Sequence, residues 1–195
     1  MSPMMFPRMF SSHGEGWDWL MRVHPSVLRM FFNYVLPLSI IPPAMLFYAG
    51  HTYRGAPLPA IGTPQLVTIV ALFFITELVA VPLMAKVIQR LGQVADCTPA
   101  YHDAYTLAAV APTPLWLAPL CLFIPSLLVN AVVGVLAWFG AGLLIYQGVS
   151  RVYGVDDEGR SLLLAGSVLA AGLVAWAAMM GLTLVSWGWA VAGRA

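Results

Sequence analysis

Five long apolar stretches are the feature that most constrains the fold of this chain. Each is at least 20 residues long, and short polar segments separate them. A helix rises about 1.5 Å per residue, so about 20 residues cross the hydrocarbon core of a bilayer. The stretches lie at residues 31–50, 65–88, 104–124, 127–149 and 162–189. The sequence therefore predicts an all-α integral membrane protein, a single bundle of five transmembrane helices.

The scarcity of charge agrees with a membrane location. Only 9% of the 195 residues are charged, whereas about 25% are charged in an ordinary soluble domain. Because this number of charged side chains is too small to cover a water-exposed surface, we expect the lipid bilayer to be the principal partner. The formal net charge is +1 and the basic residues are scattered. This pattern gives no electrostatic footprint for nucleic acid.

The basic residues also predict an orientation. Most lie in the N-terminal segment or near the second and fourth connections: Arg8, Arg22, Arg29, Lys86, Arg90, Arg151 and Arg160. Only Arg54 and Arg194 lie on the other side of the predicted bundle. Because Lys and Arg are retained on the cytoplasmic side, we expect a cytoplasmic N-terminus and a C-terminus outside.

The domain organisation follows from the same boundaries. Residues 1–30 are predicted to form a cytoplasmic or interfacial tail, and residues 31–195 the membrane domain. No uninterrupted apolar run of signal-peptide length occurs in the first 25 residues. We expect Trp17 and Leu20 in this tail to lie against the lipid headgroups.

Proline and small residues are distributed unevenly among the spans. The third span contains Pro112, Pro114 and Pro119, which predicts an irregular helix covered by the rest of the protein. The fourth and fifth spans instead contain small residues four apart: Ala137/Ala141, Gly166/Ala170, Ala171/Ala175 and Ala177/Gly181. Small side chains let helix backbones approach closely. These two spans are predicted to form either the packing core or a homodimer face.

The connections carry signals for helix ends. Pro125 stops the third span and Ser126 is placed to cap the fourth, which predicts a tight antiparallel hairpin. Gly154 is expected to end the fourth helix, and the fifth is expected to start near Ser161.

Glu77 is the sharpest candidate for a functional residue, because it lies near the middle of the second span. A carboxylate at that depth is costly and must face the bundle interior or be protonated. One interpretation is a proton or cation site shared with Thr76 and hydroxyls such as Thr183 or Ser186. The other is a neutral acid hydrogen-bonded to a carbonyl that a proline has freed. Both interpretations stay open.

The inner loop offers a second constellation. Asp96, Cys97, His102 and Asp103 lie within eight residues and are all possible metal ligands. Their spacing matches no established zinc pattern, so we expect no metal here and expect Asp103 to cap the third helix. His24 is isolated in the sequence and is predicted to be solvated.

Several catalytic signatures are absent from the sequence. It contains no phosphate-binding glycine loop, helical zinc motif, serine nucleophile elbow or paired cysteines. We therefore expect neither an enzyme nor a bound cofactor.

Two segments resemble a known family. Residues 108–118 contain Thr113 and Pro114 in an arrangement similar to a "Thr-Pro-x-x-Leu-Ala" segment, with Pro112 just before them. Pro125 follows at a similar distance, and residues 143–149 resemble "Leu-Leu-Tyr-x-Gly" through Tyr146 and Gly148. Both segments are similar to the bacterial branch of the Yip domain family of Ypt/Rab-interacting proteins.

The resemblance implies a five-span fold, a bacterial inner-membrane location and a non-enzymatic role. Eukaryotic relatives bind Rab-type GTPases and each other; no Rab-type GTPase is expected as a partner in a bacterium. Together with the small-residue spans, this predicts a membrane scaffold or adaptor that associates with itself or with other membrane proteins. The alternative is a conduit for a small solute, a proton or a cation that uses Glu77.

Overall fold

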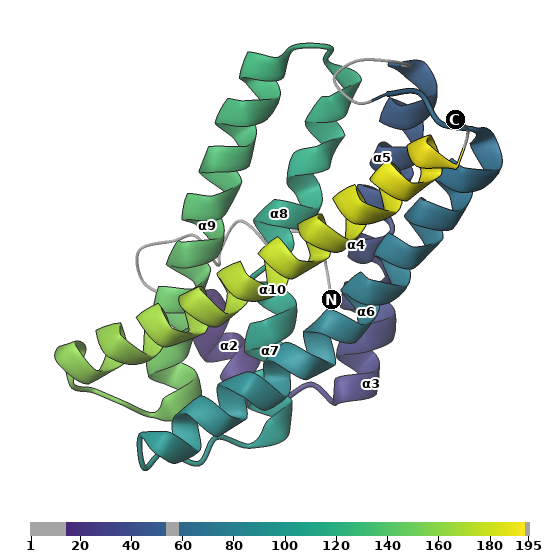
Figure 1. Ribbon diagram of the computed structural model, residues 1–195. Coiled ribbons are helices and arrows are strands. Elements are labelled where there is room, and N and C mark those ends of the chain that lie inside the picture. Colours follow the sequence, from purple (N-terminus) through teal and green to yellow (C-terminus); the bar gives the residue numbers. More distant parts are fainter. Residues whose placement is uncertain (1–14, 54–58, 194–195) are drawn as a thin grey trace.

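The computed structural model describes residues 15–53 and 59–193, and all regular structure in them is helical (Figure 1). The helices before the first connection are α2 (Glu15–Val23), α3 (Val27–Met30), η2 (Phe31–Val35), α4 (Leu36–Ser39) and α5 (Ile41–Thr52). Those after it are α6 (Thr63–Val94), α7 (Tyr101–Val110), α8 (Thr113–Leu117), η3 (Ala118–Phe123), α9 (Leu127–Tyr153) and α10 (Glu158–Ala192).

The five predicted spans are confirmed. The helical segments long and apolar enough to cross a membrane are Val27–Thr52, Thr63–Val94, Tyr101–Phe123, Leu127–Tyr153 and Glu158–Ala192. Most of them run beyond the predicted limits. The difference arises because the predicted limits follow the apolar residues, whereas the helices continue through the polar residues at their ends.

The third span is broken, as its prolines predict. It consists of α7, a short α8 and the 3₁₀ turn η3. Pro112 is the N-cap of α8, and Pro114 and Pro119 occupy the first turns of α8 and η3. A chain reversal at Pro125 then leads into α9, whose N-cap Ser126 accepts a hydrogen bond from the Val129 N–H. The predicted hairpin between the third and fourth spans is confirmed (Figure 1).

One predicted helix start is wrong, a second lies a few residues late, and one helix end is right. The N-cap of α7 is Ala100, so Asp103 lies in the first turn and bonds His24 instead of capping the helix. Helix α10 begins at Glu158, ahead of Ser161, because Asp157 accepts a hydrogen bond from the Arg160 N–H and serves as the cap. Gly154 ends α9 with a left-handed φ of 62°, as predicted.

Helix α2 packs into the core. The expectation that Trp17 and Leu20 lie against the lipid headgroups is therefore wrong. Trp17 and Leu20 are fully buried. The reason is Gly148 on α9, where an added Cβ would meet the Trp17 ring and Leu107 Cδ1, each at 2.7 Å. Asp18 also accepts a 2.8 Å hydrogen bond from Arg151 Nε. The bare backbone at Gly148 therefore lets α2 dock between α9 and α7.

Helix α10 crosses the outside of the bundle, over α6 and α9 (Figure 1). Only 6% of its most apolar stretch is buried, the lowest share of the five spans. The main core cluster draws heavily on α7, with contributions from α2, α6, α9 and, from the first part of α10, Leu164, Ala165 and Val168. The fifth span therefore joins the packing core through a few residues, and most of its length stays free for the predicted homodimer face.

We predict that Gly148→Ala destabilises the protein by about 1 to 3 kcal/mol, because the new methyl group overpacks the contact with Trp17 and Leu107. The measurement is the free energy of unfolding of the detergent-solubilised chain. Gly134→Ala on the same helix is the matched control. Nothing lies within 4 Å of a Cβ at Gly134, so that change should leave stability unaltered or raise it. Equal losses in the two variants would contradict this account of α2 docking.

Candidate functional site

Glu77 lies on the inward face of α6 and is only 4% exposed. It shares this face with Phe73 and Val81, which follow the helical spacing of four residues and are also buried. The expectation that the carboxyl group faces the bundle interior is therefore met.

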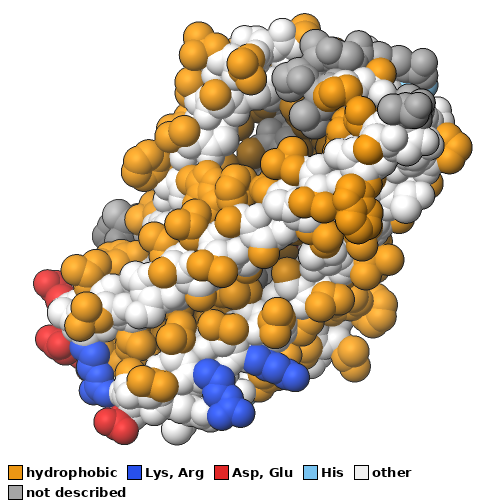
Figure 2. Space-filling model, viewed as in Figure 1, with side chains coloured by type: hydrophobic (Ala, Val, Ile, Leu, Met, Phe, Trp, Pro, Cys, Tyr) orange, Lys and Arg blue, Asp and Glu red, His pale blue; other side chains and the backbone are white. Residues whose placement is uncertain are grey.

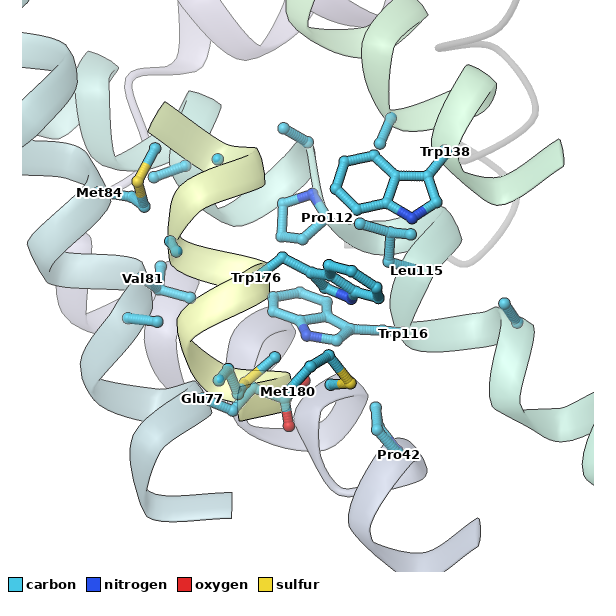
Figure 3. A pocket seen from close by; sticks show the side chains of 18 of the residues that line it. Pro42, Glu77, Val81, Met84, Pro112, Leu115, Trp116, Trp138, Trp176 and Met180 are labelled. Atoms are coloured by element: carbon cyan, nitrogen blue, oxygen red, sulfur yellow. The ribbon is translucent and has the colours of Figure 1, made fainter. Parts of the chain in front are cut away.

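The Glu77 side chain lines a cavity of about 600 Å³ between α6, α8, α9 and α10. Three tryptophans contribute to its wall: Trp116, Trp138 and Trp176 (Figure 3). The Trp138 and Trp176 rings meet edge to face, with centroids 5.1 Å apart. We refer to this cavity as the Glu77 pocket. Its size matches pockets that hold small organic ligands.

The two oxygens of the Glu77 carboxyl group have different surroundings. The indole of Trp116 donates a hydrogen bond to the group, but Oε2 is buried and has no hydrogen-bond partner among the described residues. Apart from Glu77, the residues that line the pocket include no ionisable side chain. An unpartnered buried oxygen is costly and indicates room for a donor or a cation in the pocket.

The hydroxyl groups expected near Glu77 bond elsewhere. Thr76, Thr183 and Ser186 each donate a hydrogen bond to the carbonyl four residues earlier in their own helix. None of the three lines the pocket. Sequence reasoning missed the three tryptophans instead, because they come from three different helices and no spacing connects them.

The residues of the family-like segment around Thr113 form the break in the third span. Pro114 has no N–H, so the Val110 carbonyl four residues earlier loses its helical donor. The Thr113 hydroxyl supplies a replacement hydrogen bond to that carbonyl at 2.6 Å. Because this bond uses the Thr113 proton, the Tyr34 hydroxyl donates to Thr113 Oγ1, at 2.8 Å. The break thus replaces the hydrogen bond that Pro114 removes from the Val110 carbonyl.

The other residues of the family-like segments have structural positions. Pro125 lies at the turn between η3 and α9, and Gly148 accommodates α2. Tyr146 is exposed on α9. None of these three residues lines the Glu77 pocket.

The inner-loop candidates form two sets that share Asp103. Asp96, Cys97 and Asp103 line a polar hollow together with Arg151 and Arg160. His102 and Asp103 also converge with His24, which is 78 residues away from His102. Sequence reasoning treated His24 as solvated, and no local spacing could have revealed this contact.

Comparison with known proteins identifies the family. The family model described as the Yip1 domain matches residues 8–179. The chain belongs to the Yip1 domain family. It is 23% identical over 185 residues to inner membrane protein YohC of Escherichia coli K12, covering 93% of this chain and 94% of YohC. The YohC protein of Escherichia coli O6:H1 strain CFT073 is equally similar. No solved structure matches the chain.

The resemblance read from the sequence is thus confirmed, and the chain is a multi-pass inner-membrane protein. The family match spans α2 and most of the membrane helices, including all the residues that line the Glu77 pocket except Met180.

We predict that the contributions of Trp116 and Glu77 to stability depend on each other, because the two side chains share a hydrogen bond. Trp116→Phe removes the donor and leaves the carboxyl group unpaired, which should cost about 1 to 3 kcal/mol. In a Glu77→Leu background the same substitution should cost clearly less. Unfolding of the purified protein in SDS measures both losses.

Trp176→Phe is the control for this cycle, because Trp176 lines the same pocket and packs on Trp138. Its cost should be the same with Glu77 and with Leu at that position. If Trp116→Phe were equally costly in both backgrounds, the bond would not stabilise the fold.

Proposed function

We propose that this Yip1-family protein is a non-enzymatic membrane scaffold or adaptor that works through association of α10 with a second copy of the chain or with another membrane protein. The observation that carries the proposal is the outward face of α10, which is open and carries small residues between the exposed side chains of Leu163, Leu173 and Leu184. In this proposal the N-terminus lies in the cytoplasm and the C-terminus lies outside, because most Lys and Arg residues lie on the same side of the bundle as the N-terminus. Neither nucleic acid nor a Rab-type GTPase is a partner in this proposal.

Small residues recur along one side of α10 at helical spacing. Gly166, Ala170, Ala177, Gly181 and Gly188 are all exposed. At 100° per residue they fall within a narrow stripe, opposite the face that carries the buried Val168. We call these five residues the α10 stripe. No atom lies within 4 Å of a Cβ built at its three glycines.

Glycine in a helix interior costs about 1 kcal/mol relative to alanine, so three exposed glycines on one face call for a compensating gain. Within this chain they bring no second backbone close. In a bilayer the compensating gain comes from a neighbouring helix, which approaches closely over glycine and alanine and packs through van der Waals contacts. A partner helix on the α10 stripe is therefore the arrangement that explains its composition.

We predict that bulky residues on the stripe abolish self-association. A Leu173→Cys reporter, exposed on the same side of α10, is placed in a chain that carries Cys97→Ser and Cys121→Ser. Oxidation in native membranes should then yield a disulfide-linked dimer. Adding Ala177→Leu and Gly181→Leu should reduce the dimer at least about tenfold, since leucine keeps the backbones apart.

Ala178→Leu is the matched control, because Ala178 is also exposed but points about 90° away from the centre of the stripe. It should leave the dimer yield unchanged. Failure of the reporter to cross-link, or an equal loss with Ala178→Leu, would reject α10 as a self-association surface.

A second candidate function rests on the unpartnered oxygen of Glu77. The Glu77 pocket combines one carboxyl group with aromatic and aliphatic walls, a composition that suits a lipophilic cation through charge attraction and cation–π contacts. A conduit would need further polar groups to carry a solute or proton onward. The described lining offers no second ionisable residue, so we favour binding over transport at this pocket.

We predict that tetraphenylphosphonium binds the purified protein and quenches its tryptophan fluorescence in a saturable way. Glu77→Gln should weaken this binding at least about tenfold, because the amide lacks the negative charge that attracts the cation. Tetraphenylborate has the same shape and the opposite charge, and it should not bind saturably. Equal binding of the two ions, or no effect of Glu77→Gln, would exclude a cation site at Glu77.

A further inference from the structure

Three potential metal ligands meet where the segment after α2 touches the start of α7. His24 Nδ1 lies 3.0 Å from Asp103 Oδ1, His102 Nε2 lies 3.1 Å from His24 Nδ1, and His102 Nε2 lies 3.3 Å from Asp103 Oδ1. The three donor atoms thus form a nearly equilateral triangle. We call these residues the His24 cluster.

Hydrogen bonds alone do not satisfy this triangle. An imidazole nitrogen is either a donor or an acceptor, and a carboxylate oxygen is only an acceptor. When three atoms are mutually in contact, at least one pair must then consist of two donors or two acceptors. One of the three short contacts is therefore unfavourable in every protonation state that keeps the Asp103 carboxylate ionised.

A metal ion satisfies all three contacts at once. A tetrahedral zinc ion binds nitrogen and oxygen ligands at about 2.0 to 2.2 Å, which places the ligand atoms about 3.3 to 3.6 Å from each other. The observed separations of 3.0 to 3.3 Å are within a few tenths of an ångström of the short end of that range. We propose that the His24 cluster binds one divalent transition-metal ion of the zinc class.

The surroundings of the cluster fit such a site. Side-chain exposure is 54% for His24 and 39% for His102, whereas Asp103 is 15% exposed. The ion can thus enter from water, and its fourth position is left for a water molecule, as in sites with three protein ligands. Two imidazoles select zinc-class metals over magnesium and calcium, which prefer oxygen ligands.

The backbone at His24 also points to a constraint. His24 has a φ of 41°, and it is one of two non-glycine residues with positive φ in the described part of the chain. That conformation costs about 1 to 3 kcal/mol in general and persists where surrounding contacts hold it. Here it terminates α2, since the His24 N–H bonds the Leu20 carbonyl. It also brings the ring to His102, with ring centroids 5.0 Å apart.

The test uses the full-length chain without a polyhistidine tag, purified in detergent and freed of metal. Titration with Zn²⁺ should show one saturable site per chain, and Zn²⁺ should raise the melting temperature. The double variant His24→Ala/His102→Ala should lose at least about a hundredfold in affinity, because two of the three protein ligands are gone.

The chain has four histidines, which provides a matched control. The variant His13→Ala/His51→Ala removes the same number of imidazoles while keeping His24, His102 and Asp103, and it should keep the affinity for Zn²⁺. Asp103→Asn should weaken binding with little change in shape, and Co²⁺ bound to the unmodified protein should show the visible spectrum of a four-coordinate site. The proposal is overturned if the unmodified protein shows no saturable Zn²⁺ or Co²⁺ site, or if both double variants bind equally.

Discussion

A backbone carbonyl in the hydrocarbon core has to be bonded within the protein, and the break in the third span shows how this chain meets that demand. Pro114 deprives the Val110 carbonyl of its helical partner, and the Thr113 hydroxyl replaces it. Tyr34 then donates to Thr113, so the first span is tied to the break. Trp116 follows in α8 and donates to Glu77. The proline break thus determines where Trp116, the donor to the Glu77 carboxyl group, lies.

The same break separates two parts of the bundle. Helix α7 below it is buried from residue 104 to residue 110, whereas η3 above it has no buried residue. The end of the η3–α9 hairpin near η3 diverges from α10, which crosses the bundle diagonally, whereas the rest of α9 contacts α10 (Figure 1). The Glu77 pocket lies between these elements. Charged side chains visible on this face gather at one end of the molecule (Figure 2).

The elements that depend on local sequence could be predicted, and those that depend on contacts between distant segments could not. Apolar length gave the five spans, and proline gave the break in the third. The start of α10 was predicted a few residues late, near Ser161, because any of several consecutive acidic residues could serve as the cap that Asp157 provides. The burial of Trp17 could not be predicted, since it depends on the bare backbone of Gly148 on another helix.

The candidate sites follow the same rule. Glu77 was evident from the cost of a carboxylate within an apolar run, but its partner Trp116 depends on how α8 turns after the break. The sequence showed His102 and Asp103 as possible ligands. The third ligand, His24, follows α2 and comes close to them only in the folded protein. A chain whose ligands come from separate elements gives no spacing that a motif could capture.

The burial of α7 also bears on which function the bundle can perform. This helix carries His102 and Asp103 in its first turn and leads directly into Thr113 and Trp116 after its last. Between these ends it packs on all sides, with every residue from 104 to 110 buried. Transport by alternating access requires elements to move against each other around a central site. A helix held this tightly between α2, α6 and α9 opposes such movement, because close-packed interiors do not deform gradually. The rigid centre and the open outer face of α10 together favour a protein that binds and associates over one that transports.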